Sequence, residues 1–336
     1  MVVFPLDGGR EIIDIGPKVS RISLPAESEK RGENRMPAPP EKSEKKRATL
    51  AAVGSILLWC ASGVCFARGA RLLGPMAYLT LMTATGVITV VLLQRFRGQP
   101  FADLVRLPLR VMVAGFWGVA FYTVILALAF GIAPERAIGQ VNLLNYLWPV
   151  WIVLLSAVLI REKTRLFPTA AGVLLGFAGI VVARGPAELL RAPENPLPLF
   201  LALLGGFLWA GYSVLLRRWR IPAEQGGTAF HFTLCALMAA AVAAIRGEWQ
   251  NLPPVGAEAL FWILFGGIGP VGLAYHWWEI GVKRGHVPLI STLAYFIPIG
   301  STLLIGLLFR DAMGPNLLFG AVLIAAGAWL AGQAQA

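Results

Sequence analysis

Long apolar stretches separated by short polar breaks run from residue 48 almost to the end of the chain. Stretches of about 18–25 apolar residues are long enough to cross ~30 Å of hydrocarbon as a helix. Ten of them follow one another, at 48–67, 75–95, 110–131, 135–160, 166–184, 196–216, 226–245, 257–281, 286–309 and 313–333. The pattern therefore predicts an all-α membrane protein with ten transmembrane helices.

The second half of the chain repeats features of the first half at a spacing of 149 residues. Tyr146 and Pro149 recur as Tyr295 and Pro298, within the stretches YLWPVWIVLLSAVLIRE and YFIPIGSTLLIGLLFRD. Five spans are an odd number, so the second repeat is expected to be inverted in the membrane relative to the first. Inverted repeats of this kind are typical of secondary transporters, in which the substrate site lies between the repeats near the midplane.

Composition and charge support a membrane protein and argue against a nucleic-acid partner. The chain is 57% apolar and 14% charged, with a mean hydropathy of +0.68. A soluble domain of this length could not bury so much apolar surface. The net charge is +11, but the basic residues lie between apolar runs and form no basic face. The expected partners are the lipid bilayer and a small-molecule substrate.

The charges also predict an orientation. We divide the chain into a disordered cytoplasmic tail at 1–47, a first five-helix repeat at 48–184 and a second at 196–333. With the N-terminus inside, 22 of the 29 lysines and arginines fall on the cytoplasmic side and 7 on the other. Basic residues are enriched in cytoplasmic loops, so both termini are expected to be cytoplasmic.

Further features of the chain resemble a known family. Two five-helix repeats, a basic N-terminal segment and a proline early in helices 4 and 9 resemble the drug/metabolite transporter superfamily and its EamA-type module. The stretches QVNLLNYLWPVWIVLLSAVLIRE and AYHWWEIGVKRGHVPLISTLAYFIPIGSTLL resemble the bacterial aromatic amino acid exporters. The resemblance covers residues 50–333. It implies export of amino acids or related metabolites across the bacterial inner membrane without ATP.

Amide and aromatic side chains within the predicted helices are candidates for substrate binding. Asn142, Asn145 and Pro149 share one face of helix 4, and buried amides in hydrocarbon need hydrogen-bond partners. Aromatic rings suit a flat apolar substrate, and the amides suit its zwitterionic end. Packing between helices is the alternative role. The predicted substrate-binding residues are Asn142, Asn145, Tyr146, Trp209, Tyr275, Ser291 and Tyr295.

Four residues are candidate hinges. Pro149 and Pro298 stand at equivalent positions of the two repeats, and proline removes a helical hydrogen bond. Gly269 and Pro270 belong to the run GGIGPVG in helix 8, where helical propensity is poor. Such a backbone survives in a membrane when it is buried or lines a wet cavity. Inert kinks and close packing at glycine are the alternatives.

Ionisable groups within the predicted spans are His231, His276 and Glu279. Groups of this kind inside a membrane are candidates for a gate or a proton relay. All three are expected near the cytoplasmic side, and Glu279 has an alternative role as a surface ion pair with Lys283. A midplane carboxylate is missing from the predicted spans, so we expect transport driven chiefly by the substrate gradient.

Other functional classes have weaker support. Cys60, Cys65 and Cys235 have no metal-ligand spacing, and we expect neither a metal nor a cofactor. Motifs for intramembrane catalysis or nucleotide hydrolysis are missing from the sequence, so an enzyme is not expected. A passive facilitator or channel for small amphipathic metabolites, or a multidrug-type exporter, stays as the alternative. Small residues in the helices at 166–184 and 313–333 are candidates for close packing within the chain or a homodimer interface.

Overall fold

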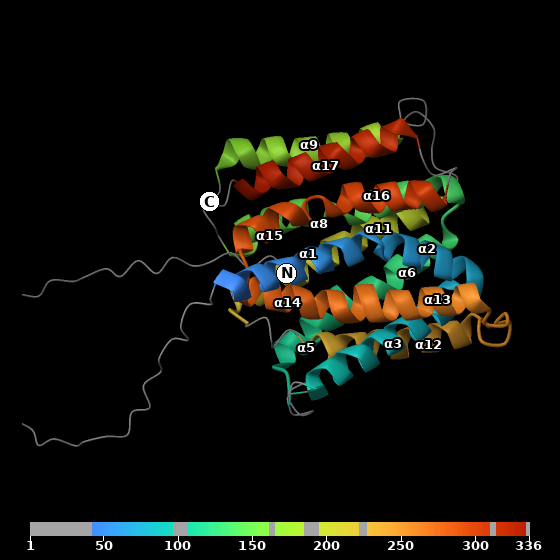
Figure 1. Cartoon of the computed structure of the whole chain (residues 1–336). Coiled ribbons are helices and arrows are strands. Elements are labelled where there is room, and N and C mark those ends of the chain that lie inside the picture. The colour runs from blue at the N-terminus through green and yellow to red at the C-terminus, as the bar shows by residue number, and fades with distance from the viewer. Residues whose placement is uncertain are drawn as a thin grey trace, which may run out of the picture.

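The computed structural model describes residues 42–96, 98, 106–160, 165–184, 195–221, 227–309 and 314–333, and these residues fold into a helical bundle (Figure 1). The described part of the chain contains helices and no strand. Residues 1–41, most of the predicted tail, lie outside it.

In the first repeat the helices follow the predicted spans closely. The first span is longer than predicted, because α1 begins at Lys42 and α2 continues from Ser62 after a break at Ala61. The elements are α1 (Lys42–Cys60), α2 (Ser62–Leu73), α3 (Pro75–Phe96), α5 (Leu109–Gly115), the π-helix η1 (Phe116–Phe121), α6 (Tyr122–Ile132), the 3-10 turn η2 (Glu135–Ala137), α7 (Ile138–Asn145), α8 (Trp148–Leu159) and α9 (Leu166–Arg184).

The predicted second repeat has a similar order of elements, with a continuous first helix and a second π-helix in its third span. These elements are α11 (Leu197–Arg218), α12 (Thr228–Ile245), α13 (Ala257–Gly266), the π-helix η4 (Gly267–Leu273), α14 (Ala274–Arg284), α15 (Val287–Ala294), α16 (Ile297–Leu308) and α17 (Pro315–Gln333). The bounds of α15, α16 and α17 each lie 149 residues after those of α7, α8 and α9. The spacing of the repeated residues is therefore also the spacing of the helices.

Length and apolar composition make several of these helices able to cross a membrane. Among the described residues, seven helical segments are long and apolar enough, and three further apolar helices are shorter, at Phe167–Ala183, Ile297–Leu308 and Pro315–Leu330. The chain is therefore a multi-pass membrane protein. Many of its large apolar side chains face outward, including Phe96 and Ile245, as expected for a surface that contacts lipid.

The prolines of the two broken helices lie directly after the break. In the first repeat α7 ends at Asn145 and Pro149 lies in the first turn of α8; in the second repeat α15 ends at Ala294 and Pro298 lies in the first turn of α16. Proline is favoured in a first turn, where its missing N–H has no helical acceptor. Each proline therefore begins a new helix.

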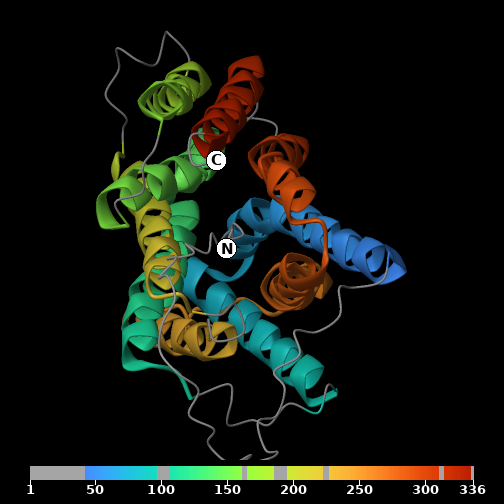
Figure 2. The ribbon, with the colours of Figure 1, turned by 90° about the vertical axis from the view of Figure 1, so that its left-hand side faces the viewer.

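Equivalent helices of the two repeats pack against each other. Helices α9 and α17 lie side by side at one edge of the bundle, and α3 packs on α12 at the opposite edge (Figures 1 and 2). A Cβ on Gly179 would come within 2.7 Å of the Gly320 carbonyl oxygen, and one on Gly327 within 2.6 Å of the Gly172 oxygen. These glycines therefore allow close packing of two helices within the chain, as one of the two predicted roles requires. A homodimer interface formed by the same helices stays a prediction.

Candidate functional site

A central cavity of about 130 Å³ lies between the two halves of the chain. Both halves contribute to its wall, through α1, α2, α3, α6, α7 and α8 from the first and α11, α12, η4, α14, α15 and α16 from the second. Aromatic side chains make up a large part of this wall: Trp59, Phe66, Tyr122, Phe130, Tyr146, Trp148, Trp209, Phe232, Tyr275 and Trp278. The site is therefore suited to an apolar or aromatic group.

Two asparagines bring polar groups to this wall. Asn142 and Asn145 are both buried and both line the cavity from α7. The Ser301 hydroxyl on α16 donates a hydrogen bond of 3.1 Å to Oδ1 of Asn142. Among the described residues, Nδ2 of Asn142 has no hydrogen-bond partner. Because a buried donor without a partner costs roughly 1–3 kcal/mol, this amide is a ready binding group for an acceptor on a ligand.

The cavity wall, as far as the structure describes it, consists of apolar, aromatic and neutral polar residues without a charged side chain. Burying an unpaired charge in such a site would be costly. A ligand with a net charge therefore finds no opposite charge there, whereas a zwitterion of zero net charge can be held by neutral amides and hydroxyls.

Trp59 joins the first helix to the irregular part of the eighth span. Its Nε1 donates a hydrogen bond of 3.2 Å to the carbonyl oxygen of Pro270 within η4. Its ring lies 5.3 Å from that of Tyr275 and 5.2 Å from that of Trp278. The Ser55 hydroxyl donates to the carbonyl of Ala274, the first residue of α14, over 2.8 Å. Side chains of α1 thus satisfy one carbonyl group within the π-helical segment and one directly after it.

Five of the predicted substrate-binding residues come together in this cavity, namely Asn142, Asn145, Tyr146, Trp209 and Tyr275. Tyr295 is half-buried and does not belong to the cavity wall. The side chain of Ser291 lies outside the described residues. Of the predicted hinge residues, Pro270 lines the cavity, and Gly269 is buried with Leu58 close to it.

The three predicted gate residues are not part of the cavity wall. His231 is fully buried, and a Cβ on Gly115 would overlap its imidazole ring. That ring packs edge-on against Tyr212 at 6.0 Å. His276 is half-buried on α14, and the side chain of Glu279 lies outside the described residues.

Sequence reasoning missed several residues of the wall, of which Trp59, Tyr122 and Phe232 are examples. For Trp59 a signal existed, because it lies 150 residues before Trp209, which was predicted to bind substrate. The periodicity of the sequence offered no comparable signal for Tyr122 and Phe232.

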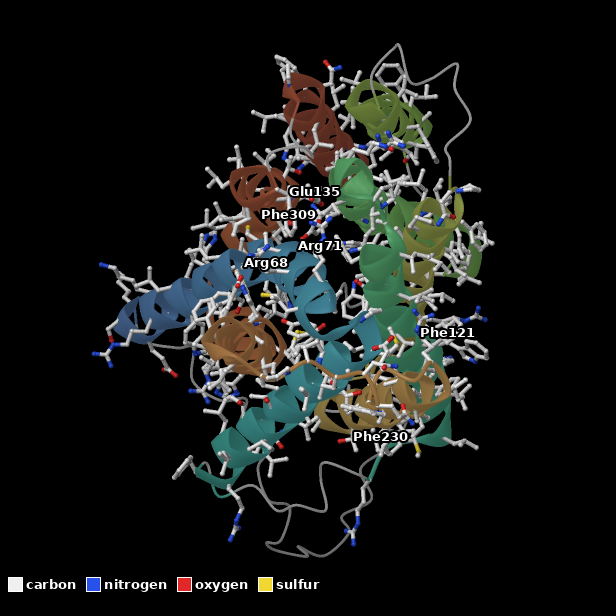
Figure 3. The ribbon with its side chains drawn as sticks, turned by 90° about the vertical axis from the view of Figure 1, so that its right-hand side faces the viewer. Arg68, Arg71, Phe121, Glu135, Phe230 and Phe309 are labelled. Carbon is white, nitrogen blue, oxygen red and sulfur yellow. The ribbon has the colours of Figure 1, made fainter. Side chains whose placement is uncertain are left out.

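At one end of the bundle, ion pairs and an aromatic contact connect α2 to its neighbours (Figure 3). Arg68 pairs with Glu258 of α13 at 2.7 Å, and Arg71 pairs with Glu135 of η2 at 2.8 Å. The Arg71 guanidinium also lies 4.8 Å above the Phe309 ring. Exposed ion pairs of this kind contribute only about 0–1 kcal/mol each. They are weak enough to break and re-form if this end opens.

Known proteins match this chain over most of its length. The EamA-like transporter family matches residues 196–333. The "Aromatic amino acid exporter YddG" of Ancylobacter novellus is 36% identical over 292 residues, which are 85% of this chain and 97% of that protein. The protein of the same name from Salmonella typhimurium is 28% identical, over 85% of this chain and 98% of that protein.

One solved structure supports the same relationship. This structure, named only "Crystal structure of protein", is 32% identical to this chain and aligns with a TM-score of 0.64 over 86% of this chain and 99% of its own.

Proposed function

The chain belongs to the EamA-like transporter family, and from this membership we propose that it is a secondary transporter that exports aromatic or bulky apolar amino acids. The relatives that cover most of its length are named aromatic amino acid exporters. The observation that carries the proposal is the cavity between the repeats, which combines many aromatic rings with Asn142 and Asn145 and has no charged side chain among its described residues.

The proposed architecture has ten transmembrane helices in two inverted five-helix repeats. Two contacts between helices support it, because α3 packs on α12 and α9 packs on α17. In each contact the two helices occupy the same position in the first and in the second repeat. A pseudo-two-fold axis also requires that contacts between non-equivalent helices occur twice. The contact of α1 with α14 has such a counterpart in the contact of α11 with α6.

The proposed location is the bacterial inner membrane, with both termini in the cytoplasm. The excess of basic residues on one side supports this orientation. The end of the bundle with the Arg68–Glu258 and Arg71–Glu135 pairs then faces away from the cytoplasm. Export requires that this end open to release the substrate.

In the proposed binding mode, the substrate ring stacks among Trp59, Trp209 and Tyr275 while its zwitterionic end meets the asparagines. Offset or edge-on aromatic pairs contribute roughly 0.5–1.5 kcal/mol beyond the burial of surface. The free Nδ2 of Asn142 can donate to the substrate carboxylate. A hydrogen bond to a charged group contributes about 1.5–3 kcal/mol, so these amides favour the amino acid over a plain hydrocarbon.

The proposed hinges are the helix breaks before Pro149 and Pro298 and the two π-helices η1 and η4. The two breaks lie in corresponding spans of the two repeats, and so do the two π-helices. The repeats can therefore exchange conformations around the cavity. A gating role for His231, His276 and Glu279 at the cytoplasmic side stays a prediction of the sequence. The names of the relatives do not favour a channel or a multidrug exporter.

The test is transport by the purified chain in liposomes, with labelled phenylalanine, tryptophan, leucine, aspartate and lysine. Phenylalanine and tryptophan are expected to exchange faster than aspartate and lysine. Internal unlabelled phenylalanine should accelerate the uptake of labelled phenylalanine, because a carrier returns loaded whereas a channel does not. Preference for the charged amino acids would contradict the proposed substrate, and the lack of acceleration would contradict alternating access.

A further inference from the structure

A groove on the outer surface runs between the third span and α11, and its lining residues differ from those of the central cavity. We name it the α5–α11 groove. Its apolar walls include Val113 and Trp117 on one side and Phe207, Leu208 and Leu215 on the other. Val113 and Trp117 are each about half exposed, at 51% and 50%, and Phe207 is 41% exposed. Figure 2 shows these helices on the outer rim of the bundle.

One end of the groove is positively charged. Arg110 lies in its wall, with its guanidinium 5.5 Å above the ring of Trp219, which is also in the wall. Arg106 is exposed four residues earlier, before the start of α5, and Arg218 is exposed at the end of α11. The sequences of 106–132 and 197–221 contain no acidic residue, and Asp103 and Glu224 stand just outside these ranges. Arginine and tryptophan are the usual residues at the boundary between hydrocarbon and headgroups.

The floor of the groove has room for an occupant. Gly211 lies in it, and a Cβ on that residue would meet no atom within 4 Å. An apolar trough that opens to the membrane is filled by hydrocarbon chains, and cations at its end attract an anionic headgroup. Basic pockets between transmembrane helices on the cytoplasmic side bind anionic lipids in this way.

We propose that the α5–α11 groove is a binding site for an anionic phospholipid of the cytoplasmic leaflet. One acyl chain lies along Val113, Trp117 and Leu208 and over Gly211, and the headgroup phosphate pairs with Arg110. The Trp219 ring holds the Arg110 side chain in place through the cation–π contact.

The bound lipid would touch a residue that connects the groove to the transport cavity. Tyr212 lies in the groove wall and is otherwise buried. Its ring is 5.8 Å from that of Trp209, which is 5.7 Å from that of Tyr122. Trp209 and Tyr122 both line the central cavity. The lipid also covers η1, where the helical hydrogen bonds are irregular. Lipid in the groove therefore supports the wall of the cavity from outside.

The test measures lipid retained by the purified full chain, using native mass spectrometry after incubation with phosphatidylglycerol or phosphatidylcholine of the same acyl chains. The wild type is expected to retain one phosphatidylglycerol under conditions that remove phosphatidylcholine. Arg110→Gln should weaken phosphatidylglycerol retention about fivefold, which is the contribution of one arginine near a charged surface. Gly211→Leu fills the groove and should reduce retention of phosphatidylglycerol.

Two matched variants serve as controls. Arg95→Gln removes an exposed arginine at the end of α3, on the same predicted side of the membrane. Gly256→Leu adds the same side chain at a position that also has open space. Both should retain phosphatidylglycerol like the wild type. Circular dichroism shows whether every variant is folded, and a misfolded Gly211→Leu is replaced by Gly211→Val.

Three results would overturn the lipid site. The first is equal retention of the two lipids by the wild type. The second is an effect of Arg110→Gln no larger than that of Arg95→Gln. The third is a dimer that Gly211→Leu abolishes, because it would assign the groove to a second copy of the chain. The measurement involves no amino acid substrate, so it is independent of the proposed transport function.

Discussion

The Ser301 hydroxyl donates its 3.1 Å hydrogen bond to Asn142 across 159 residues of sequence, and so connects α16 of the second repeat to α7 of the first. Both side chains are buried. Gly63 of α2 lies against the same pair, so three helices meet where the cavity wall carries its amide. A hydrogen bond placed there orients Asn142 and leaves its Nδ2 for a substrate.

Gly63→Ala is expected to destabilise the protein and to impair transport. The added Cβ would overlap Oδ1 of Asn142 and lie 3.2 Å from Oγ of Ser301. Overpacking of this kind costs roughly 1–3 kcal/mol, since the two side chains must move. Thermal unfolding in detergent measures the first effect and exchange in liposomes the second. Gly256→Ala, at a site with open space, is the control, and an equal effect of both substitutions would contradict this packing.

Asn145→Ala should reduce transport per folded molecule by about tenfold or more, whereas Tyr295→Ala should change it by less than about threefold. The reason is that Asn145 lines the cavity and Tyr295 does not, and a lost hydrogen bond to a charged substrate group costs about 1.5–3 kcal/mol. Initial rates of phenylalanine exchange, normalised to monodisperse protein, measure both. A larger loss at Tyr295 would support the substrate-binding role that the sequence predicted for this residue.

Trp59→Phe tests the connection between α1 and η4. Phenylalanine keeps an aromatic ring near Tyr275 and Trp278 but removes the N–H that donates to the Pro270 carbonyl. Leaving that carbonyl without a partner costs about 1–3 kcal/mol in the conformation described here. The balance between conformations should therefore shift, and the maximal exchange rate should change more than the half-saturating phenylalanine concentration. Trp329→Phe, at an exposed site on α17, should change neither quantity.

The orientation is tested by cysteine labelling in intact cells with a reagent that does not cross the membrane. Gln250→Cys, in the exposed turn after α12, should react from outside, and Arg218→Cys, at the end of α11, should react only after the cells are opened. Cys60, Cys65 and Cys235 are buried, so their background labelling should be low. The reverse pattern would contradict the orientation derived from the basic residues.

The helix positions could be predicted from hydrophobicity because each span must be apolar over its whole length. The predicted span at 166–184 has the same bounds as α9, and the span at 75–95 differs from α3 by one residue. The tail boundary was harder to predict. The charged residues after Lys42 belong to α1. Hydrophobicity could not predict this part of the helix, because its residues are polar and form no apolar pattern.

The irregular backbone was only half predictable. The sequence of η4 contains Pro270, and proline signals a break in helical hydrogen bonding. The corresponding segment η1 reads FWGVAF and has no proline. Tertiary contacts mark it instead, because Gly115 packs against His231 and Gly118 against Tyr212. Local propensity cannot predict contacts between residues about 100 positions apart. The same holds for Trp59, whose place in the cavity wall depends on how α1 packs on α14.

The last prediction concerns the driving force. A proton-coupled carrier needs a group that binds a proton in one conformation and releases it in the other, and a carboxylate in the substrate cavity is a common solution. The described wall of this cavity has no Asp, Glu or His, and His231, which packs beside Gly115, is not part of that wall. We therefore expect no sustained accumulation of phenylalanine when a pH gradient is imposed on liposomes without a substrate gradient. An outward phenylalanine gradient should drive flux at any pH that leaves the protein folded. Sustained uphill uptake that disappears in His231→Gln, with exchange at equal pH preserved, would make His231 the proton carrier and would contradict transport driven by the substrate gradient alone.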